Sequence, residues 1–87
     1  MKTKFQTKLK DYLRKELLKT RYAKALSQEK MAPYLEISTR ALGSVENGDS
    51  CPSLVTFLIY CYRFCPEPDR LLRDIFSILA ELEKNDL

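Results

Sequence analysis

The segment from Ser27 to Gly48, SQEKMAPYLEISTRALGSVENG, restricts the fold of this chain more than any other stretch. Its apolar residues recur at helical spacing in two short runs, namely Met31, Ala32 and Leu35, then Leu42 and Val45. Ser27 and Ser38 each stand directly before one run, where a hydroxyl group caps the first turn of a helix. The segment therefore predicts two short helices, over residues 28–35 and 39–47, joined by a tight turn.

The apolar stripes of these two helices can pack against each other, with Ile37 in the turn between them. Such packing leaves the N-terminal side of the second helix facing outward. This is the helix-turn-helix arrangement, in which the second helix enters the major groove of DNA.

The spacing of these residues resembles the phage-repressor and Cro-like (Xre-type) helix-turn-helix family, and the resemblance covers most of residues 17–65. The residues that carry it are Arg21, Ser27, Gln28, Glu29, Met31, Ala32, Leu35, Ile37, Ser38, Leu42, Val45, Glu46, Asn47, Gly48, Pro52, Ser53, Leu54, Leu58 and Cys61. The resemblance implies an all-α, compact five-helix lambda-repressor-like domain with the helix-turn-helix at helices 2 and 3. The implied function is a sequence-specific double-stranded DNA-binding transcriptional regulator, a repressor acting as a homodimer.

The remaining sequence predicts three further helices around this segment, so that residues 1–87 form one domain. The first covers residues 3 to about 24, where Phe5, Leu9, Leu13 and Leu17 form the apolar stripe. The fourth follows a cap at Ser53 and ends at Phe64, and the fifth runs from Pro68 to about residue 84. Only two glycines occur, and leucine, lysine and alanine are common, which also suits an all-α chain.

The last two predicted helices carry more apolar residues than one core stripe needs. The expected core stripe of the fourth helix consists of Leu54, Phe57, Leu58, Cys61 and Phe64, and that of the fifth of Leu71, Leu72, Ile75, Leu79 and Leu82. Further apolar residues lie beside both stripes, so each helix is expected to be covered on more than one face. The segment 66–87 is therefore a candidate dimer contact, and we expect a homodimer through helices 4 and 5.

Charge is distributed unevenly along the chain, whose formal net charge is +3. Residues 1–30 contain ten Lys or Arg and three Asp or Glu, whereas residues 31–87 contain five and nine. This pattern is either a solvated basic face or a surface for polyanion binding through counterion release. The candidate phosphate contacts are Lys8, Lys10 and Lys24, and residues 1–12 are a basic helical extension or an arm that orders on DNA.

The start of the second short helix contains the candidate base-reading residues Ser38, Thr39 and Arg40. The guanidinium of Arg40 matches O6 and N7 of guanine, although a contact to phosphate alone is the alternative. Gly43 and Ser44 lie further along the same helix and complete the outward-facing set.

Two more residues of the segment are candidate DNA contacts with structural alternatives. Gln28 begins the first short helix and can contact a phosphate or only cap the helix locally. Asn47 can reach a phosphate or end the helix together with Gly48. The resemblance also implies that Arg21 pairs with Glu46 and ties the first helix to the DNA-reading helix, with a phosphate contact by Arg21 as the alternative.

Three residues depart from the family pattern. Pro33 deletes a backbone hydrogen bond within the first short helix and is expected to kink it. Glu36 occupies a turn position where glycine is common, so it adopts a left-handed conformation or reshapes the turn. Gly43 weakens the second short helix and removes a side chain that could read a base.

Several other classes of function lack support in the sequence. Histidine is absent, and we find no nucleophile–base set, phosphate loop or metal-ligand spacing, so no enzyme, cofactor or metal site is predicted. The three cysteines imply no disulfide framework; they are core residues or, alternatively, a redox sensor. No apolar run of membrane-spanning length and no signal peptide is recognised, so a cytoplasmic protein without a small-molecule ligand is expected. The alternative function is a protein-interaction module, such as the antitoxin of a toxin–antitoxin pair or a partner of another regulator.

Overall fold

The computed structural model describes residues 4–86, and in this range it consists of helices without any strand. The elements are α1 (Lys4–Ala23), α2 (Gln28–Met31), the 3-10 helix η1 (Ala32–Leu35), α3 (Thr39–Glu46), α4 (Leu54–Phe64) and α5 (Pro68–Asp86). The prediction of an all-α chain with five α-helices is confirmed for the described part. The fifth helix extends to residue 86, two residues beyond the predicted end.

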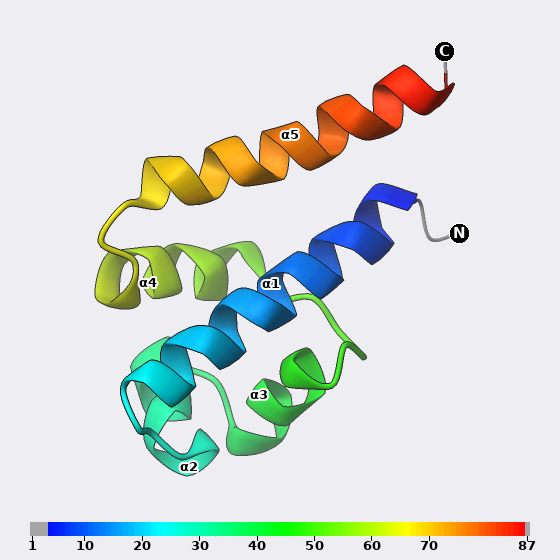
Figure 1. Ribbon diagram of the computed structural model, residues 1–87. Coiled ribbons are helices and arrows are strands. Elements are labelled where there is room, and N and C mark those ends of the chain that lie inside the picture. Colours follow the sequence, from blue (N-terminus) through cyan, green and yellow to red (C-terminus); the bar gives the residue numbers. More distant parts are fainter. Residues whose placement is uncertain (1–3, 87) are drawn as a thin grey trace.

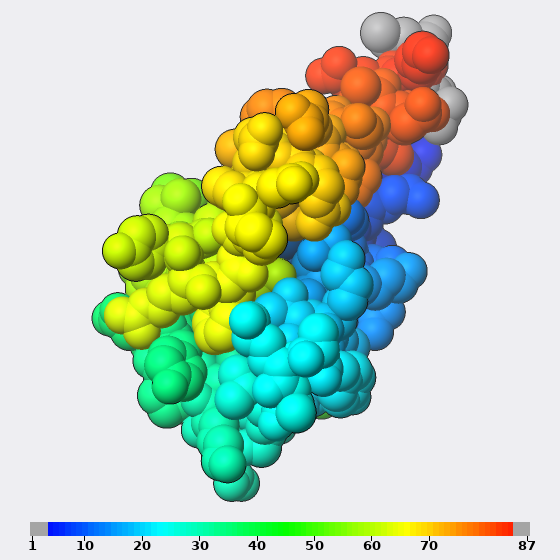
Figure 2. Space-filling model, turned by 60° about the vertical axis from the view of Figure 1, so that its left-hand side comes forward, coloured from blue at the N-terminus to red at the C-terminus, as the bar shows by residue number. Residues whose placement is uncertain are grey.

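Helix α1 lies at the centre of the arrangement (Figure 1). Helix α3 packs against it, α2 and η1 pack against α3, and η1 also packs on α4. Helix α5 runs back along α1 in the opposite direction, so the N-terminal half of α1 and the C-terminal half of α5 project together from the body (Figures 1 and 2). This projection elongates the molecule, whose extents are 44 × 28 × 21 Å.

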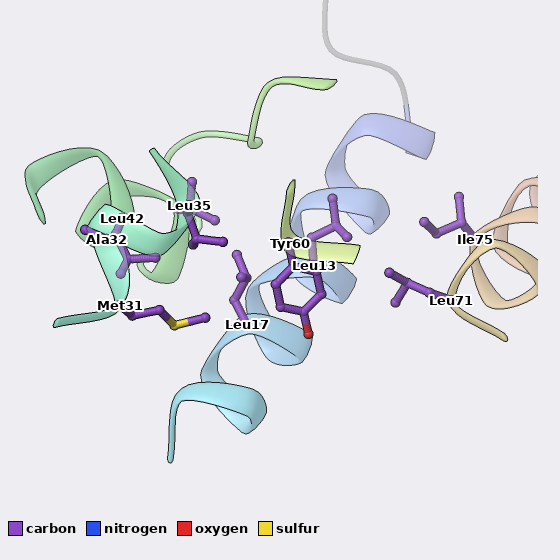
Figure 3. Close-up of a cluster of buried hydrophobic side chains, with 10 residues drawn as sticks. Leu13, Leu17, Met31, Ala32, Leu35, Leu42, Tyr60, Leu71 and Ile75 are labelled. Atoms are coloured by element: carbon purple, nitrogen blue, oxygen red, sulfur yellow. The ribbon is translucent and has the colours of Figure 1, made fainter. Parts of the chain in front are cut away.

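The core is a cluster of apolar side chains contributed by every helical element (Figure 3). Its members are Leu13, Leu17, Met31, Ala32, Leu35, Leu42, Val45, Tyr60, Leu71 and Ile75. Both apolar stripes of the 27–48 segment are thus buried, and Met31, Leu35 and Leu42 are fully so. Burial of such side chains contributes roughly 1.5–3 kcal/mol each, which is why this short segment can hold its place without long helices.

Three serines cap helices as the sequence predicts. The hydroxyl of Ser27 accepts the N–H of Lys30 at 3.1 Å, and that of Ser38 accepts the N–H of Ala41 at 3.0 Å. Ser53 caps α4 in the same way, through a 3.1 Å bond from the N–H of Thr56. Each cap satisfies a backbone donor that has no partner within its helix, which fixes where the helix begins.

The helix predicted over residues 28–35 is instead two elements, because α2 ends at Met31 and the chain tightens into η1. Pro33 explains the change, since it lacks the N–H that would continue the α-helical ladder and takes the second position of the 3-10 helix without loss. Glu36 then adopts the left-handed conformation, with φ 57° and ψ 39°. Its N–H bonds the carbonyl of Pro33, and this compact turn directs the chain into α3.

The predicted core stripe of α4 is correct only in part, because Phe57, Cys61 and Phe64 pack against the core but the two leucines do not. Leu54 and Leu58 are 71% and 56% exposed, whereas Thr56 and Tyr60 are buried. The reason is that Tyr60 places its ring in the core and satisfies its hydroxyl group at the 2.8 Å contact with the hydroxyl of Thr20. A pattern based on hydropathy cannot anticipate such a partner, so it favoured the leucine face.

The stripe of α5 is also only partly buried. Leu71 and Ile75 lie in the core, but Leu72 and Leu79, which were predicted to join them, are 42% and 37% exposed. Phe76, beside the predicted stripe, is 62% exposed. The helix therefore presents a second apolar face outside the core.

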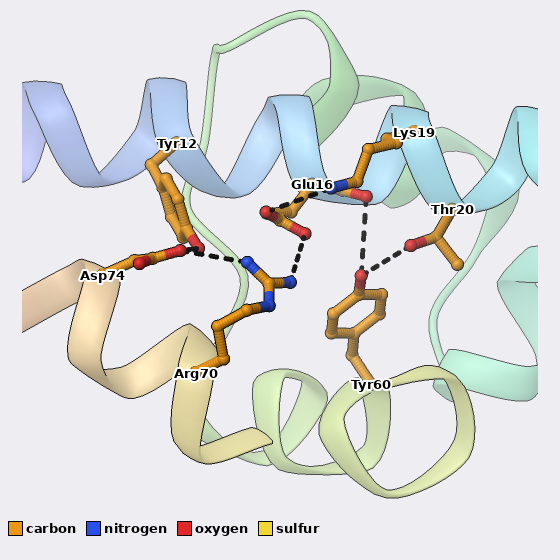
Figure 4. A network of polar contacts seen from close by, with 7 residues as sticks. All are labelled: Tyr12, Glu16, Lys19, Thr20, Tyr60, Arg70 and Asp74. Atoms are coloured by element: carbon orange, nitrogen blue, oxygen red, sulfur yellow. Dashed lines mark hydrogen bonds and ion pairs between the residues drawn. The ribbon is translucent and has the colours of Figure 1, made fainter. Parts of the chain in front are cut away.

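A polar network joins α5 and α4 to the central helix (Figure 4). The hydroxyl of Tyr12 donates to Asp74 at 2.8 Å, and Arg70 bonds the same carboxylate at 3.1 Å. Arg70 also lies 3.8 Å from the carboxylate of Glu16, which is buried on α1. Burial, and then the hydrogen bond to Asp74, raise the pKa of Tyr12, so this hydroxyl keeps its proton at neutral pH.

Candidate nucleic-acid interface

The first feature of the candidate site is a buried ion pair that connects α1 to α3. The guanidinium of Arg21 donates to both oxygens of the Glu46 carboxylate, from Nε at 2.7 Å and from Nη2 at 2.9 Å. The third guanidinium nitrogen, Nη1, bonds the carbonyl of Leu26 at 3.1 Å. Only 12% of the Arg21 side chain and 3% of the Glu46 side chain are exposed, so this is the pair expected from the resemblance and it faces inward. The geometry fixes α3 relative to α1.

Gln28 belongs to the same cluster. Its amide Nε2 donates to Oε1 of Glu46 at 2.8 Å, so its side chain holds α3 on the side that faces the protein interior. Gly43 lies alongside, and a Cβ added there would be 3.7 Å from Oε1 of Gln28. A phosphate contact by Gln28 would therefore use its backbone N–H and the second N–H of its side-chain amide.

The start of α3 presents its predicted base-reading residues to solvent. Thr39 and Arg40 are exposed, as is Ser38, whose hydroxyl is engaged by the cap. Among residues 4–86, Arg40 has no hydrogen-bond or ion-pair partner in this structure, so its guanidinium is available to a ligand. The Ser38 cap and the Arg21–Glu46 pair hold the backbone of α3 in place. Less backbone entropy is therefore lost when Arg40 binds a ligand.

The end of α3 is closed by a Schellman motif. The N–H of Gly48, at φ 82°, bonds the carbonyl of Val45 at 3.1 Å, and the N–H of Asp49 bonds that of Ser44 at 2.9 Å. The Ser44 hydroxyl lies 3.0 Å from that of Ser50, so this half-buried side chain ties α3 to the following loop. Asn47 is exposed at the C-cap, and both of the alternatives predicted for it remain compatible with this position.

The structure separates the three candidate phosphate-binding lysines. Lys10 lies close enough to Cys51, in the loop after α3, to lower the pKa of that thiol slightly against the larger effect of burial. Lys8 instead lines a hollow with Ile78 of α5. Lys24 lines another hollow, with Tyr34 and other residues at the ends of η1 and α4. Of the three, Lys10 is the one whose charge acts on the loop after α3.

Arg14 is a basic residue near α3 that the sequence analysis did not single out. Its side chain runs past Gly48, where an added Cβ would lie 3.6 Å from Cδ of Arg14. Asp11 holds its guanidinium through a 2.8 Å bond. The spacing of four residues between Lys10 and Arg14 places both on one helical face, and this was the signal available in the sequence.

The cysteines show no sign of activation. All three are free thiols, and Cys51 is exposed, so it is not the core residue that the sequence suggested; desolvation is the main cause that raises the pKa of Cys51 and of Cys61. A raised pKa keeps a thiol protonated and slows its oxidation, because the thiolate is the reactive form. Cys61 and Cys65 are half-buried and pack against the core, as expected for structural cysteines.

Comparison with protein-family models, curated proteins and solved structures found no match to this chain. Within residues 4–86, no three His, Cys, Asp or Glu side chains gather as a metal site would require. None of the helices described is both long and apolar enough to cross a membrane. The geometry around α3 is therefore the main guide to function.

Proposed function

We propose that this chain is a double-stranded DNA-binding transcriptional regulator of the lambda-repressor-like type, a repressor that acts as a homodimer. Helix α2 with η1 forms the first half of its helix-turn-helix, and α3 is the helix that enters the major groove. The observation that carries the proposal is the exposed, unpartnered Arg40 at the start of α3, on a helix fixed from behind by Arg21, Gln28 and Glu46.

The basic residues beside α3 support the same proposal. Arg14 lies next to Gly48 at the end of α3, and the charge of Lys10 acts on Cys51 in the following loop, where the phosphate backbone flanking an occupied groove would pass. Such contacts release counterions and supply affinity without reading sequence. The excess of ten basic over three acidic residues in the first thirty positions matches this role.

Base reading depends on few side chains in this proposal. Arg40 and Thr39 are exposed, whereas Gly43 has no side chain and Ser44 is tied to Ser50. A bidentate Arg–guanine contact discriminates by about 1–3 kcal/mol against another base pair. The remaining specificity would come from the shape and deformability of the DNA site.

The test begins with selection of bound sequences from random duplexes, followed by titration of the selected duplex at several salt concentrations. We expect one enriched motif and affinity that falls steeply with salt. Arg40→Ala should relax the preference at one base pair, whereas Lys15→Ala, which removes an exposed cation of α1 on the flank beside Ile78, should leave both affinity and preference unchanged. Absence of binding at low salt by the folded chain would reject the proposal.

A second candidate function is a protein-interaction module, such as the antitoxin of a toxin–antitoxin pair. The exposed apolar side chains of α4 and α5, among them Leu54 and Phe76, favour it. A chain that stays monomeric in light scattering and does not bind DNA would support this candidate over the regulator.

A further inference from the structure

A hollow opens where the ends of three helical elements meet, on the face of the molecule shown in Figure 2. It has a volume of about 630 Å³ and is lined by Leu26 after α1, Tyr34 of η1 and Phe64 at the end of α4. Two cationic side chains, Lys24 and Arg63, complete the lining, and no acidic side chain of residues 4–86 contributes to it. Hollows of roughly 300–1,000 Å³ that combine an apolar lining with a few charged groups are typical of sites for small organic ligands.

Tyr34 and Phe64 form the aromatic wall of the hollow. Their rings meet edge to face, with centroids 6.1 Å apart and planes at 87°. Phe64 is half-buried and packs against the core, whereas 52% of Tyr34 is exposed. Because a partly buried ring holds the exposed one, little side-chain entropy is lost when a ligand packs against Tyr34. The wall therefore favours a ligand with an aromatic ring of its own.

The cationic side of the hollow consists of Arg63 and Lys24, which are both exposed. Nη1 of Arg63 donates to the carbonyl of Tyr34 at 3.2 Å, and this bond orients the guanidinium. Nε and Nη2 of Arg63 have no partner among residues 4–86, and neither has the ammonium group of Lys24. A guanidinium edge with two parallel N–H groups matches a carboxylate, and Lys24 can add a third donor.

The partial charges of the helix ends do not cancel these two cations. The hollow lies at the C-terminal ends of α1 and α4. Each such end is equivalent to about −0.5 charge, so the two ends together oppose only about half of the positive charge on Lys24 and Arg63. The electrostatic balance at the hollow therefore remains positive and favours an anion over a neutral ligand.

We propose that this hollow binds a small aromatic carboxylate, with its ring against Tyr34 and Phe64 and its carboxylate on Arg63 and Lys24. No residue of α3 lines the hollow, so the proposal does not depend on DNA binding. A peptide is a poorer match. Recognition by strand addition needs a sheet edge, and residues 4–86 contain no strand. Recognition of a helix needs a long apolar groove, whereas only five residues line this hollow.

The first experiment titrates the isotope-labelled full chain, without DNA, with 3-phenylpropionate and follows its chemical shifts. We expect saturable changes at Leu26, Tyr34 and Phe64, with a Kd of about 1 mM or below, as suits a ligand of this size. The neutral 3-phenylpropionamide has nearly the same shape but cannot form the ion pair, so it should bind at least about 10-fold more weakly. Acetate, which lacks the ring, should give no saturation up to about 20 mM.

Variants test the two cations. Arg63→Gln should raise the Kd for 3-phenylpropionate at least about 10-fold. Arg73→Gln is the matched control, because it removes an exposed arginine of α5 outside the hollow and should leave the Kd unchanged. Since Arg63 also bonds η1, circular dichroism checks the fold of each variant. Lys24→Gln removes no bond within residues 4–86 and should independently raise the Kd about 3-fold.

The proposal is overturned if the shifts do not saturate, if they lie outside the hollow, or if the amide binds as tightly as the carboxylate. An unchanged Kd in folded Arg63→Gln, or in Lys24→Gln should the first variant unfold, has the same consequence. A short peptide ending in phenylalanine is titrated in parallel, and affinity at least about 10-fold tighter than that of 3-phenylpropionate would make a peptide the occupant instead. None of these outcomes bears on DNA binding, so the proposed function is accepted or rejected separately.

Discussion

Arg21 on α1 holds Glu46 on α3 through two parallel hydrogen bonds of 2.7 and 2.9 Å, 25 residues apart in the chain. Because both side chains are nearly buried, neither charge can be compensated by water if the other is removed. The pair therefore fixes the orientation of α3 relative to the central helix. The orientation of α3 in turn sets the direction in which its candidate base-reading residues point.

The first prediction concerns this pair. Replacing either residue alone, as Arg21→Met or Glu46→Leu, should lower the free energy of unfolding by about 3 kcal/mol or more, because a buried charge loses its partner. The double variant should cost clearly less than the sum of the two, which urea denaturation measures. Additive losses would show that the two residues act independently.

The two glycines should respond to alanine in opposite directions. At Gly43 the new Cβ meets Gln28 at an ordinary 3.7 Å, so Gly43→Ala should gain about 1 kcal/mol through helix propensity. At Gly48, with φ 82°, Gly48→Ala should cost roughly 1–2 kcal/mol because the left-handed conformation strains the chain. Thermal unfolding of both variants checks the contrast, and equal signs would contradict it.

Glu36 and Ala25 are non-glycine residues with positive φ, 57° and 53°. Glycine relieves the steric strain of this conformation, so Glu36→Gly and Ala25→Gly should each stabilise the fold by about 0.5–1 kcal/mol. Ala23→Gly, in the last turn of α1, is the control and should destabilise by about 1 kcal/mol. Chemical denaturation would refute the interpretation if all three variants lost stability.

Stability should fall in alkaline solution through Tyr12. Its pKa in the folded chain lies above the ordinary value of 10.0, so Tyr12 is protonated in both the folded and the unfolded state well below pH 10 and contributes no loss of stability there. Above pH 10 the unfolded state releases this proton first, and the free energy of unfolding declines as the pH rises further. Tyr12→Phe should cost about 1 kcal/mol at pH 7 through the lost bond to Asp74 and should flatten the decline. Urea denaturation between pH 8 and 11.5 measures both effects. Part of the decline should persist, since desolvation also raises the pKa of Tyr60, Cys51 and Cys61.

The basic residues of α1 should differ in their effect on DNA. Lys10→Ala and Arg14→Ala should weaken binding to all sequences alike, and each should reduce the salt slope by about 1. Lys8→Ala, on the flank facing Ile78, should change neither quantity and serves as the control. Equal losses from all three would mean that a diffuse positive field, rather than specific contacts, provides the affinity.

Local features of the fold were readable in the sequence because their causes are local. The serine caps at Ser27, Ser38 and Ser53 require only a hydroxyl directly before a helical run, and all three are present. The interruption at Pro33 follows from its missing N–H. The sequence left open how the chain would continue after this interruption, and in the structure a 3-10 helix that buries Leu35 follows α2.

The faces of α4 and α5 could not be assigned in the same way. Thr56 and Tyr60 replace Leu54 and Leu58 in the interior because Thr20, 40 residues earlier, offers a partner for the tyrosine hydroxyl. The placement of Lys8, Lys10 and Lys24 on different flanks likewise depends on which neighbours α1 acquires. The periodicity of the chain by itself determined the five α-helices, since helix formation depends on residues three and four apart, but it did not predict the 3-10 helix after α2. Only the tertiary structure decided which side of each helix meets solvent, because that choice depends on partners distant in the sequence.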